Sequence, residues 1–356
     1  MVLAISAPIL GIYSDILKKR KIFLIIASVL TCFFAFLLWF MDPAKNILIF
    51  FLVIIALGNI CFEISNVFYN SLLKKVSNEN NIGKISGIAW SLGYIGGIVS
   101  LIICFFLFVN PDIPIFDLDK EKFEHIRIIG PFIGLWFLIF SIPSFIFIKE
   151  KKTKVKKINL IKNIKKTFLS IKKTTLKFLI SRMLYTDGLN TLFVFGGIYA
   201  ATLFNMSFSE IILFGITLNI SAGIGSLIFA FFDDKYGPRK IIKICLLSLI
   251  FICSLILLSD NKTLFWILGI GIGLFIGGLQ STSRSCMARL SKKNDQSRMF
   301  GIYGLSGKIT AFLGPFFVAL LTTTFNNQKA GFVSIIIFFI LGYLIIRNLK
   351  LPYYSK

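Results

Sequence analysis

The sequence is poor in charged side chains and in the residues that build enzyme sites. Only 15% of its 356 residues are charged, against about 25% in soluble domains. The one histidine, His125, stands in a polar stretch, and the six cysteines lie in apolar stretches without Cys-x-x-Cys spacing. A soluble globule, a disulfide framework and metal sites built from His or Cys are therefore excluded. No catalytic triad or Walker loop is present either, so we expect no enzyme, metal or cofactor.

Long apolar stretches dominate the chain. Hydrophobic residues make up 56% of it, and about 20 consecutive apolar residues suffice to cross a hydrocarbon layer of about 30 Å. We therefore predict an all-α polytopic membrane protein. Its eleven expected spans are 1–14, 22–40, 47–73, 84–109, 128–148, 178–203, 209–232, 241–259, 263–290, 299–324 and 330–347.

The basic residues alternate between the loops. Of the 39 lysines and arginines, 30 lie in every second loop or at the C-terminus, and only six lie in the other loops. Basic loops face the cytoplasm. The net charge of +23 thus reflects topology rather than nucleic-acid binding. We predict a cytoplasmic C-terminus in a bacterial inner membrane.

This topology starts Met1 on the outer side, which is unexpected. About 13 residues precede Ser14 and Asp15, and a helix of that length reaches only about 20 Å. We therefore expect that a further N-terminal segment, with one whole span and the start of the next, precedes the sequence.

The two halves of the sequence repeat each other. Three features recur at nearly the same distance along the sequence. Asp15 matches Asp234 (219 residues apart), Lys74 matches Lys292 (218) and Gly87 matches Gly301 (214). Repeated halves are typical of secondary transporters. We predict an N-terminal half-bundle at 1–148, a cytoplasmic linker at 149–177 and a C-terminal half-bundle at 178–356. With the expected extra span, the halves contain six helices each.

These motifs resemble the major facilitator superfamily. Gly11, Asp15, Lys19 and Lys21 fit its signature loop, although Lys18 stands where a second glycine is usual. Residues 181–200 and 280–285 are similar to the "unknown major facilitator" branch, whose fungal relatives are vacuolar amino-acid effluxers of the autophagy system. The resemblance implies two six-helix halves around a central solute cavity.

Several polar residues lie deep in the predicted spans. Counted along a helix from the nearest cytoplasmic basic residue, Glu63, Asp187, Gln280 and Lys308 are about 14–16 Å deep. Asn66 and Asn190 each follow a carboxylate by one turn. Because ionisable groups are unfavourable at this depth, we expect these six residues to bind the solute or protons. The alternative is a buried ion pair of Lys308 with Asp187 or Glu63.

Other charged residues lie near the cytoplasmic ends of spans. We expect the long side chains of Arg182 and Arg284 to snorkel to the headgroups or form gate salt bridges. For Asp15 and Asp234, beside basic turns, the alternatives are local ion pairing and an interhelical latch, which the resemblance implies. Gating and latch candidates are Asp15, Arg20, Asp234, Arg239, Arg182 and Arg284.

Segment 149–177 carries isoleucines and Phe168 at helical spacing among its lysines. This pattern is typical of an amphipathic helix on anionic lipids. Taken together, the sequence predicts a monomeric secondary active or facilitative transporter of a small polar solute, such as an amino acid, with protons as candidate coupling ions. Sugars, osmolytes or small peptides are alternative solutes. An inactive fragment of such a transporter and a receptor or scaffold are the alternative functions.

Overall fold

A computed structural model describes residues 2–42, 48–111, 115–150 and 171–352. Within these ranges the chain consists of helices, turns and short connections, without strands, as the sequence predicts. The α-helices are α1 (Val2–Leu17), α2 (Arg20–Leu37), α3 (Leu48–Ser71), α4 (Leu73–Val76), α5 (Ile82–Cys104), α6 (Glu124–Arg127), α7 (Ile129–Phe147), α9 (Lys173–Phe204), α10 (Phe208–Tyr236), α11 (Pro238–Leu258), α12 (Lys262–Leu290), α13 (Gln296–Ser306), α14 (Leu313–Phe325) and α15 (Gln328–Ile346).

Helices lie over all eleven predicted spans, but not all of these helices are long and apolar enough to cross a membrane. Eight helical segments in the described ranges are long and apolar enough to cross a membrane. The predicted span 299–324 is not continuous, because it is broken between α13 and α14. Lys308 therefore lies in a break and not inside a helix. The predicted amphipathic helix of the linker falls mostly on 151–170, which is outside the described residues.

The break has a local cause. Pro315 has no amide hydrogen for the carbonyl of Ala311, and its ring crowds that carbonyl, so the α-helical ladder cannot run through this point. Between the helices, the amides of Gly307 and Lys308 each donate to the carbonyl three residues earlier. The segment 307–312 is thus a run of turns.

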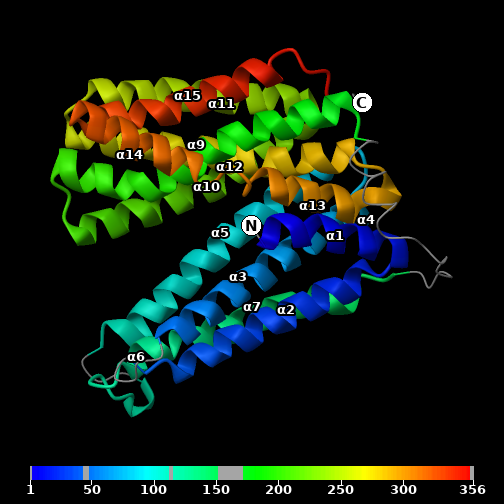
Figure 1. The fold of residues 1–356 in the computed structure, drawn as a ribbon, viewed down its shortest axis with the longest axis horizontal. Coiled ribbons are helices and arrows are strands. Elements are labelled where there is room, and N and C mark those ends of the chain that lie inside the picture. The colour runs from blue at the N-terminus through cyan, green and yellow to red at the C-terminus, as the bar shows by residue number, and fades with distance from the viewer. Residues whose placement is uncertain (1, 43–47, 112–114, 151–170, 353–356) are drawn as a thin grey trace. The chain divides into compact units, whose positions relative to one another are not determined.

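One compact unit comprises the described parts of residues 1–75, 96–160 and 294–301. In it, α2 packs against both α3 and α7 (Figure 1). Its core includes Leu24 of α2 and Phe68 of α3, together with Leu72. The opposite face of α2 exposes apolar side chains such as Ile26 and Phe33, as a helix in contact with lipid does.

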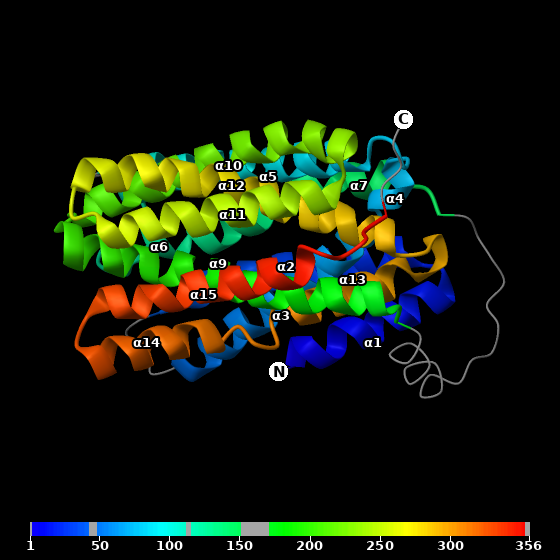
Figure 2. The same ribbon diagram turned by 90° about the horizontal axis from the view of Figure 1, so that it is seen from above.

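The other unit comprises the described parts of residues 76–95, 161–293 and 302–356. Here α10 packs on α12, α12 on α11, and α15 on both α9 and α14; these neighbours can be followed in Figure 1 and Figure 2. Each unit thus includes a short stretch from the other half of the sequence, which lies in α13 or α5. The predicted division into 1–148, 149–177 and 178–356 stays a prediction.

Two turns after repeated aspartates have left-handed backbones. Lys18 follows α1 with φ of 54°, and Gly237 follows α10 with φ of 84°. Glycine adopts positive φ without a steric penalty, whereas a lysine does not. The lysine at the position of the second motif glycine, Lys18, therefore adds local strain.

Candidate functional site

Asp15 binds the first turn of α13. Its carboxylate accepts the amides of Ser297 at 3.2 Å and of Arg298 at 2.8 Å. The guanidinium of Arg20, which is itself buried, lies 2.7 Å from the same carboxylate. The first amides of a helix lack partners within the helix and carry partial positive charge. Asp15 therefore satisfies both the end of α13 and a buried arginine.

Glycines bring α1 and α13 into backbone contact. A Cβ atom added to Gly11 would lie 2.5 Å from the carbonyl oxygen of Ser297. One added to Gly301 would lie 2.6 Å from the carbonyl oxygen of Ala7. Both distances are far inside van der Waals contact, so the approach that lets Asp15 reach the amides of α13 requires residues without a side chain.

Asp234 makes the equivalent contact with the first turn of α5. Its two oxygens accept the amides of Gly83 at 2.8 Å and Lys84 at 2.7 Å. The arginine here is Arg289 of α12, which lies 2.7 Å from Asp234. A Cβ atom on Gly87 would meet that of Ala230 at 2.2 Å, so glycine again permits close packing.

The two contacts follow the sequence repeat crosswise. Asp15 and Asp234 are equivalent at an offset of 219, and Arg298 and Lys84 at an offset of 214. The aspartate of the first half holds a helix of the second half, and the aspartate of the second half holds a helix of the first. We call these two clusters, Asp15 with Ser297 and Arg298, and Asp234 with Gly83 and Lys84, the paired aspartate contacts.

Arg289 lies in a buried network that sequence reasoning missed. Its guanidinium is 2.7 Å from Asp233 as well as from Asp234, and Ser285 also donates to Asp233. Arg239, one of the predicted latch candidates, donates to the carbonyl of Arg347. The sequence placed Arg289 among the topological charges of a loop, although it is buried on α12.

The two arginines of the spans are engaged within the protein. Arg284 is buried, and its Nε donates to the Ser86 hydroxyl at 2.9 Å. Arg182 donates to the Tyr303 carbonyl at 2.6 Å and the Ser306 hydroxyl at 2.8 Å, with its guanidinium 3.5 Å from the centre of the Tyr303 ring. The expectation of snorkelling is therefore wrong for Arg284, and Arg182 fastens α9 to the end of α13.

The deep polar residues fall into both units. Glu63 and Asn66 lie half-buried on α3 in the first unit. The second unit holds half-buried Asn190 on α9 and exposed Lys308 in the break. Their predicted role in solute or proton binding stays a prediction.

Gln280 on α12 is bound by a tyrosine of α5. The Tyr94 hydroxyl donates to its side-chain oxygen at 2.7 Å. The Tyr94 ring in turn packs 6.0 Å from that of Trp90. The predicted role of Gln280 in solute binding stays a prediction.

Asp187 on α9 is the most enclosed of the candidates. Its side chain is 1% exposed, and neither carboxylate oxygen has a hydrogen-bonding partner among the described residues. Asp187 therefore forms no ion pair with Lys308, which was one form of the alternative interpretation. Thr191, one turn later, donates its hydroxyl to the Asp187 backbone carbonyl at 2.7 Å, and Gly314 of α14 packs against this turn.

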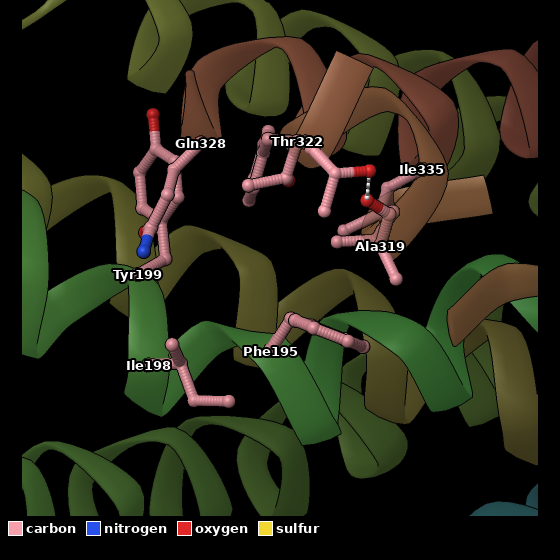
Figure 3. Close-up of a pocket in the computed structure, with 10 residues that line it drawn as sticks. Phe195, Ile198, Tyr199, Ala319, Thr322, Gln328 and Ile335 are labelled. Atoms are coloured by element: carbon pink, nitrogen blue, oxygen red, sulfur yellow. Dashed lines mark hydrogen bonds between the residues drawn. The ribbon is translucent and has the colours of Figure 1, made fainter. Parts of the chain in front are cut away.

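A separate cavity lies among α9, α14 and α15. It has a volume of about 130 Å³, below the 300–1,000 Å³ usual for ligand pockets. Figure 3 shows Phe195 and Ile198 on one side and Thr322 and Ile335 on the other. The lining is mainly apolar and includes none of the predicted site residues, so this cavity does not suit a charged solute.

Comparisons with known proteins agree with this architecture. The profile of the family described as "Vacuole effluxer Atg22 like" matches residues 1–351. The chain belongs to this family. The resemblance predicted from the sequence is thereby confirmed.

Relatives and solved structures place this Atg22-like chain within the major facilitator superfamily. It is 25% identical over 352 residues to the Bacillus subtilis "Uncharacterized MFS-type transporter YxiO", covering 97% of this chain and 81% of that protein. Autophagy-related protein 22 of Vanderwaltozyma polyspora is 25% identical over 339 residues, covering 80% of this chain and 63% of that protein.

The fold is also that of a solved sugar transporter. The structure of the proton:xylose symporter XylE bound to 6-bromo-6-deoxy-D-glucose aligns with a TM-score of 0.78 and 11% identity, covering 100% of this chain and 85% of that one. The Atg22-like chain is thus an integral membrane protein with the all-α fold of major facilitator transporters. Its family and fold are those of transporters rather than enzymes.

Proposed function

We propose that this Atg22-like protein moves a small polar solute, such as an amino acid, by alternating access. The observation that carries the proposal is the pair of aspartate contacts. Each joins a helix end from one half of the sequence to a helix end from the other, so the contacts can hold one arrangement of the halves and release it in another. Transporters with repeated halves work by such rocking.

The substrate class follows from the family and from the available charges. An amino acid carries one carboxylate and one ammonium group. Lys308 can attract the carboxylate, and Asp187 or Glu63 the ammonium group. Sugars, osmolytes and small peptides are the alternative substrates, because amides such as Asn66, Asn190 and Gln280 serve them equally well.

A thermal-shift panel tests the substrate class. Neutral, acidic and basic amino acids, sugars and dipeptides are each added to the purified protein. A ligand at a hundredfold excess over its Kd stabilises the folded state by about 2.7 kcal/mol. We expect neutral amino acids to raise the melting midpoint in the parent and in Lys329→Ala, a control lysine that pairs with Asp260. The shift should be lost in Lys308→Ala. A response to sugars or peptides alone contradicts the amino-acid assignment.

Transport in proteoliposomes separates the transporter from the other functions. Exchange of a labelled amino acid across the membrane is expected. Binding without exchange favours a receptor or scaffold, and the absence of both favours an inactive chain. Reconstitution across internal pH values also reports whether protons are co-transported.

The proposal also covers the membrane, the orientation and the lipid contacts of the protein. We place it as a monomer in a bacterial inner membrane with a cytoplasmic C-terminus, supported by the alternation of basic loops. The lysine-rich segment 149–177 is proposed to bind anionic lipids. Vesicles with and without anionic lipid test the lipid contribution.

A further inference from the structure

The carboxylate of Asp187 is buried without a counter-charge. The side chain is 1% exposed, about 15 Å along the helix from Lys177. Among the described residues no charged side chain influences it, and its one side-chain neighbour is the Thr310 hydroxyl, which forms no hydrogen bond of regular geometry with it. Burying an unpaired ionised group is strongly unfavourable. A cation or a proton must therefore neutralise this carboxylate.

A second unsatisfied oxygen lies beside it. Thr310, in the break between α13 and α14, is the neighbour of the Asp187 carboxylate. Its hydroxyl is also buried without a partner in the described residues. The two oxygen atoms are enclosed and close enough to influence each other, but no hydrogen bond of regular geometry joins them. A bound cation can complete such an arrangement.

The break leaves a backbone carbonyl without an amide donor next to Thr310 in the sequence. Because Pro315 has no amide hydrogen, the Ala311 carbonyl receives none from the position four residues on. Gly314 packs directly on the Asp187 turn, since a Cβ atom there would lie 3.0 Å from the Asp187 carbonyl oxygen. In transporters, backbone carbonyls of interrupted helices coordinate alkali cations.

We infer that Asp187, Thr310 and the Ala311 carbonyl of the break form a sodium site. One carboxylate matches one monovalent charge, whereas a divalent ion would require more acidic ligands. No group of three acidic, histidine or cysteine side chains that could hold a metal occurs in the described residues. A proton competes with sodium for the same carboxylate.

The other ionisable groups on these elements are engaged elsewhere or distant. On α9, Arg182 donates to Tyr303 and Ser306, and Tyr185 forms a hydrogen bond with Ser283. The α15 side chains that pack on this turn at Gly188 are phenylalanines. Lys308 exerts no charge effect on Asp187. Competition between sodium and protons therefore reports on Asp187.

A melting experiment on the full chain tests the site. Midpoints are measured in NaCl, KCl and choline chloride at equal ionic strength, at pH 8 and pH 5.5. We expect sodium alone to raise the midpoint by about 2–4 °C at tenfold excess over its Kd. The shift should shrink at pH 5.5, where protons compete. Equal midpoints in all three salts at pH 8 overturn the inference, as does a pH effect without any effect of sodium.

Three variants assign the ligands. Asp187→Asn should lose the sodium shift, and Thr310→Val should raise the sodium Kd at least tenfold, while Thr310→Ser retains it. Thr324→Val is the matched control, because that hydroxyl bonds only within α14. A sodium shift that persists in both Asp187→Asn and Thr310→Val refutes the site. If Asp187→Asn does not fold, the two Thr310 variants still decide.

The role of the sodium site rests on the proposed transport function. The melting experiment nevertheless tests sodium binding independently of transport. Melting reports binding, whereas proteoliposomes report transport. A sodium shift without solute exchange leaves the site intact and contradicts the transport proposal. Solute exchange without any sodium shift supports the transport proposal and contradicts the sodium site.

Discussion

The carboxylate of Asp15 accepts the backbone amide of Arg298 at 2.8 Å, across 283 positions of sequence. Its equivalent in the repeat, Asp234, accepts the amide of Lys84 at 2.7 Å. In both places a carboxylate caps the positive end of a helix. The two copies of the motif therefore perform the same physical task on each other's helices, and their removal should have matching and separable effects.

Replacing either aspartate by asparagine should loosen only the helix that it caps. Asparagine offers one acceptor oxygen in place of two and removes the charge that strengthens these hydrogen bonds. We expect Asp15→Asn to speed amide exchange in the first turn of α13, and Asp234→Asn in the first turn of α5. Hydrogen–deuterium exchange with mass spectrometry measures both segments at once.

Each variant is the control for the other, and Asp260→Asn is a control for both. Asp260 is 82% exposed and pairs only with Lys329 in the described residues, so its replacement should leave both first turns unchanged. Unaltered exchange in α13 after Asp15→Asn would mean that the carboxylate does not hold these amides.

The turn at Lys18 should tolerate glycine better than lysine. Its φ of 54° is left-handed, and a residue with a Cβ atom pays about 1–2 kcal/mol there. Replacing Lys18 by glycine removes this cost, but the greater conformational freedom of glycine in the unfolded chain offsets part of the stabilisation. We expect Lys18→Gly to stabilise the protein by up to about 1 kcal/mol in thermal unfolding. Lys19→Gly, at a φ of −122°, should give no gain.

Arg289 should be far more sensitive than Arg239. Its loss leaves Asp233 and Asp234 without their counter-ion, and a broken buried ion pair typically lowers the free energy of unfolding by about 3–5 kcal/mol. We expect Arg289→Ala to lower the melting midpoint strongly. Arg239→Ala removes one exposed hydrogen bond to a carbonyl and should change stability by about 0.5 kcal/mol or less. Similar midpoints for both variants would contradict the buried network.

The spans were predictable because the length of an apolar run can be counted directly in the sequence. The break between α13 and α14 was missed although Gly314 and Pro315 mark it, because apolar residues continue through it and mask the local signal. The depth of Lys308 was likewise assigned by counting along a helix that ends at Ser306.

The partners of the charged residues could not be read in the same way. Asp15 and Asp234 were recognised, but they bind backbone amides, and an amide carries no sequence signature. Arg289 was indistinguishable from a topological charge, because its burial depends on the packing of α10 against α12. Arg239 was a latch candidate because it is adjacent to the motif, whereas in the structure Arg289 pairs with Asp234.

Neutralising either deep carboxylate should reduce transport more than it reduces folded yield. Glu63 lies on α3 and Asp187 on α9, whereas the single histidine, His125, lies on α6 at the very beginning of the apolar segment Glu124–Phe147. These carboxylates are therefore the groups best placed to exchange a cation or proton during transport. In choline chloride, where no sodium neutralises Asp187, the Asp187→Asn variant should be at least as stable as the parent, because a buried asparagine amide is less unfavourable than a buried charge. Transport by Glu63→Gln and Asp187→Asn is compared with the parent across pH 5–8, normalised to folded protein. Parent-like transport by both variants across this range would show that neither carboxylate is needed for coupling.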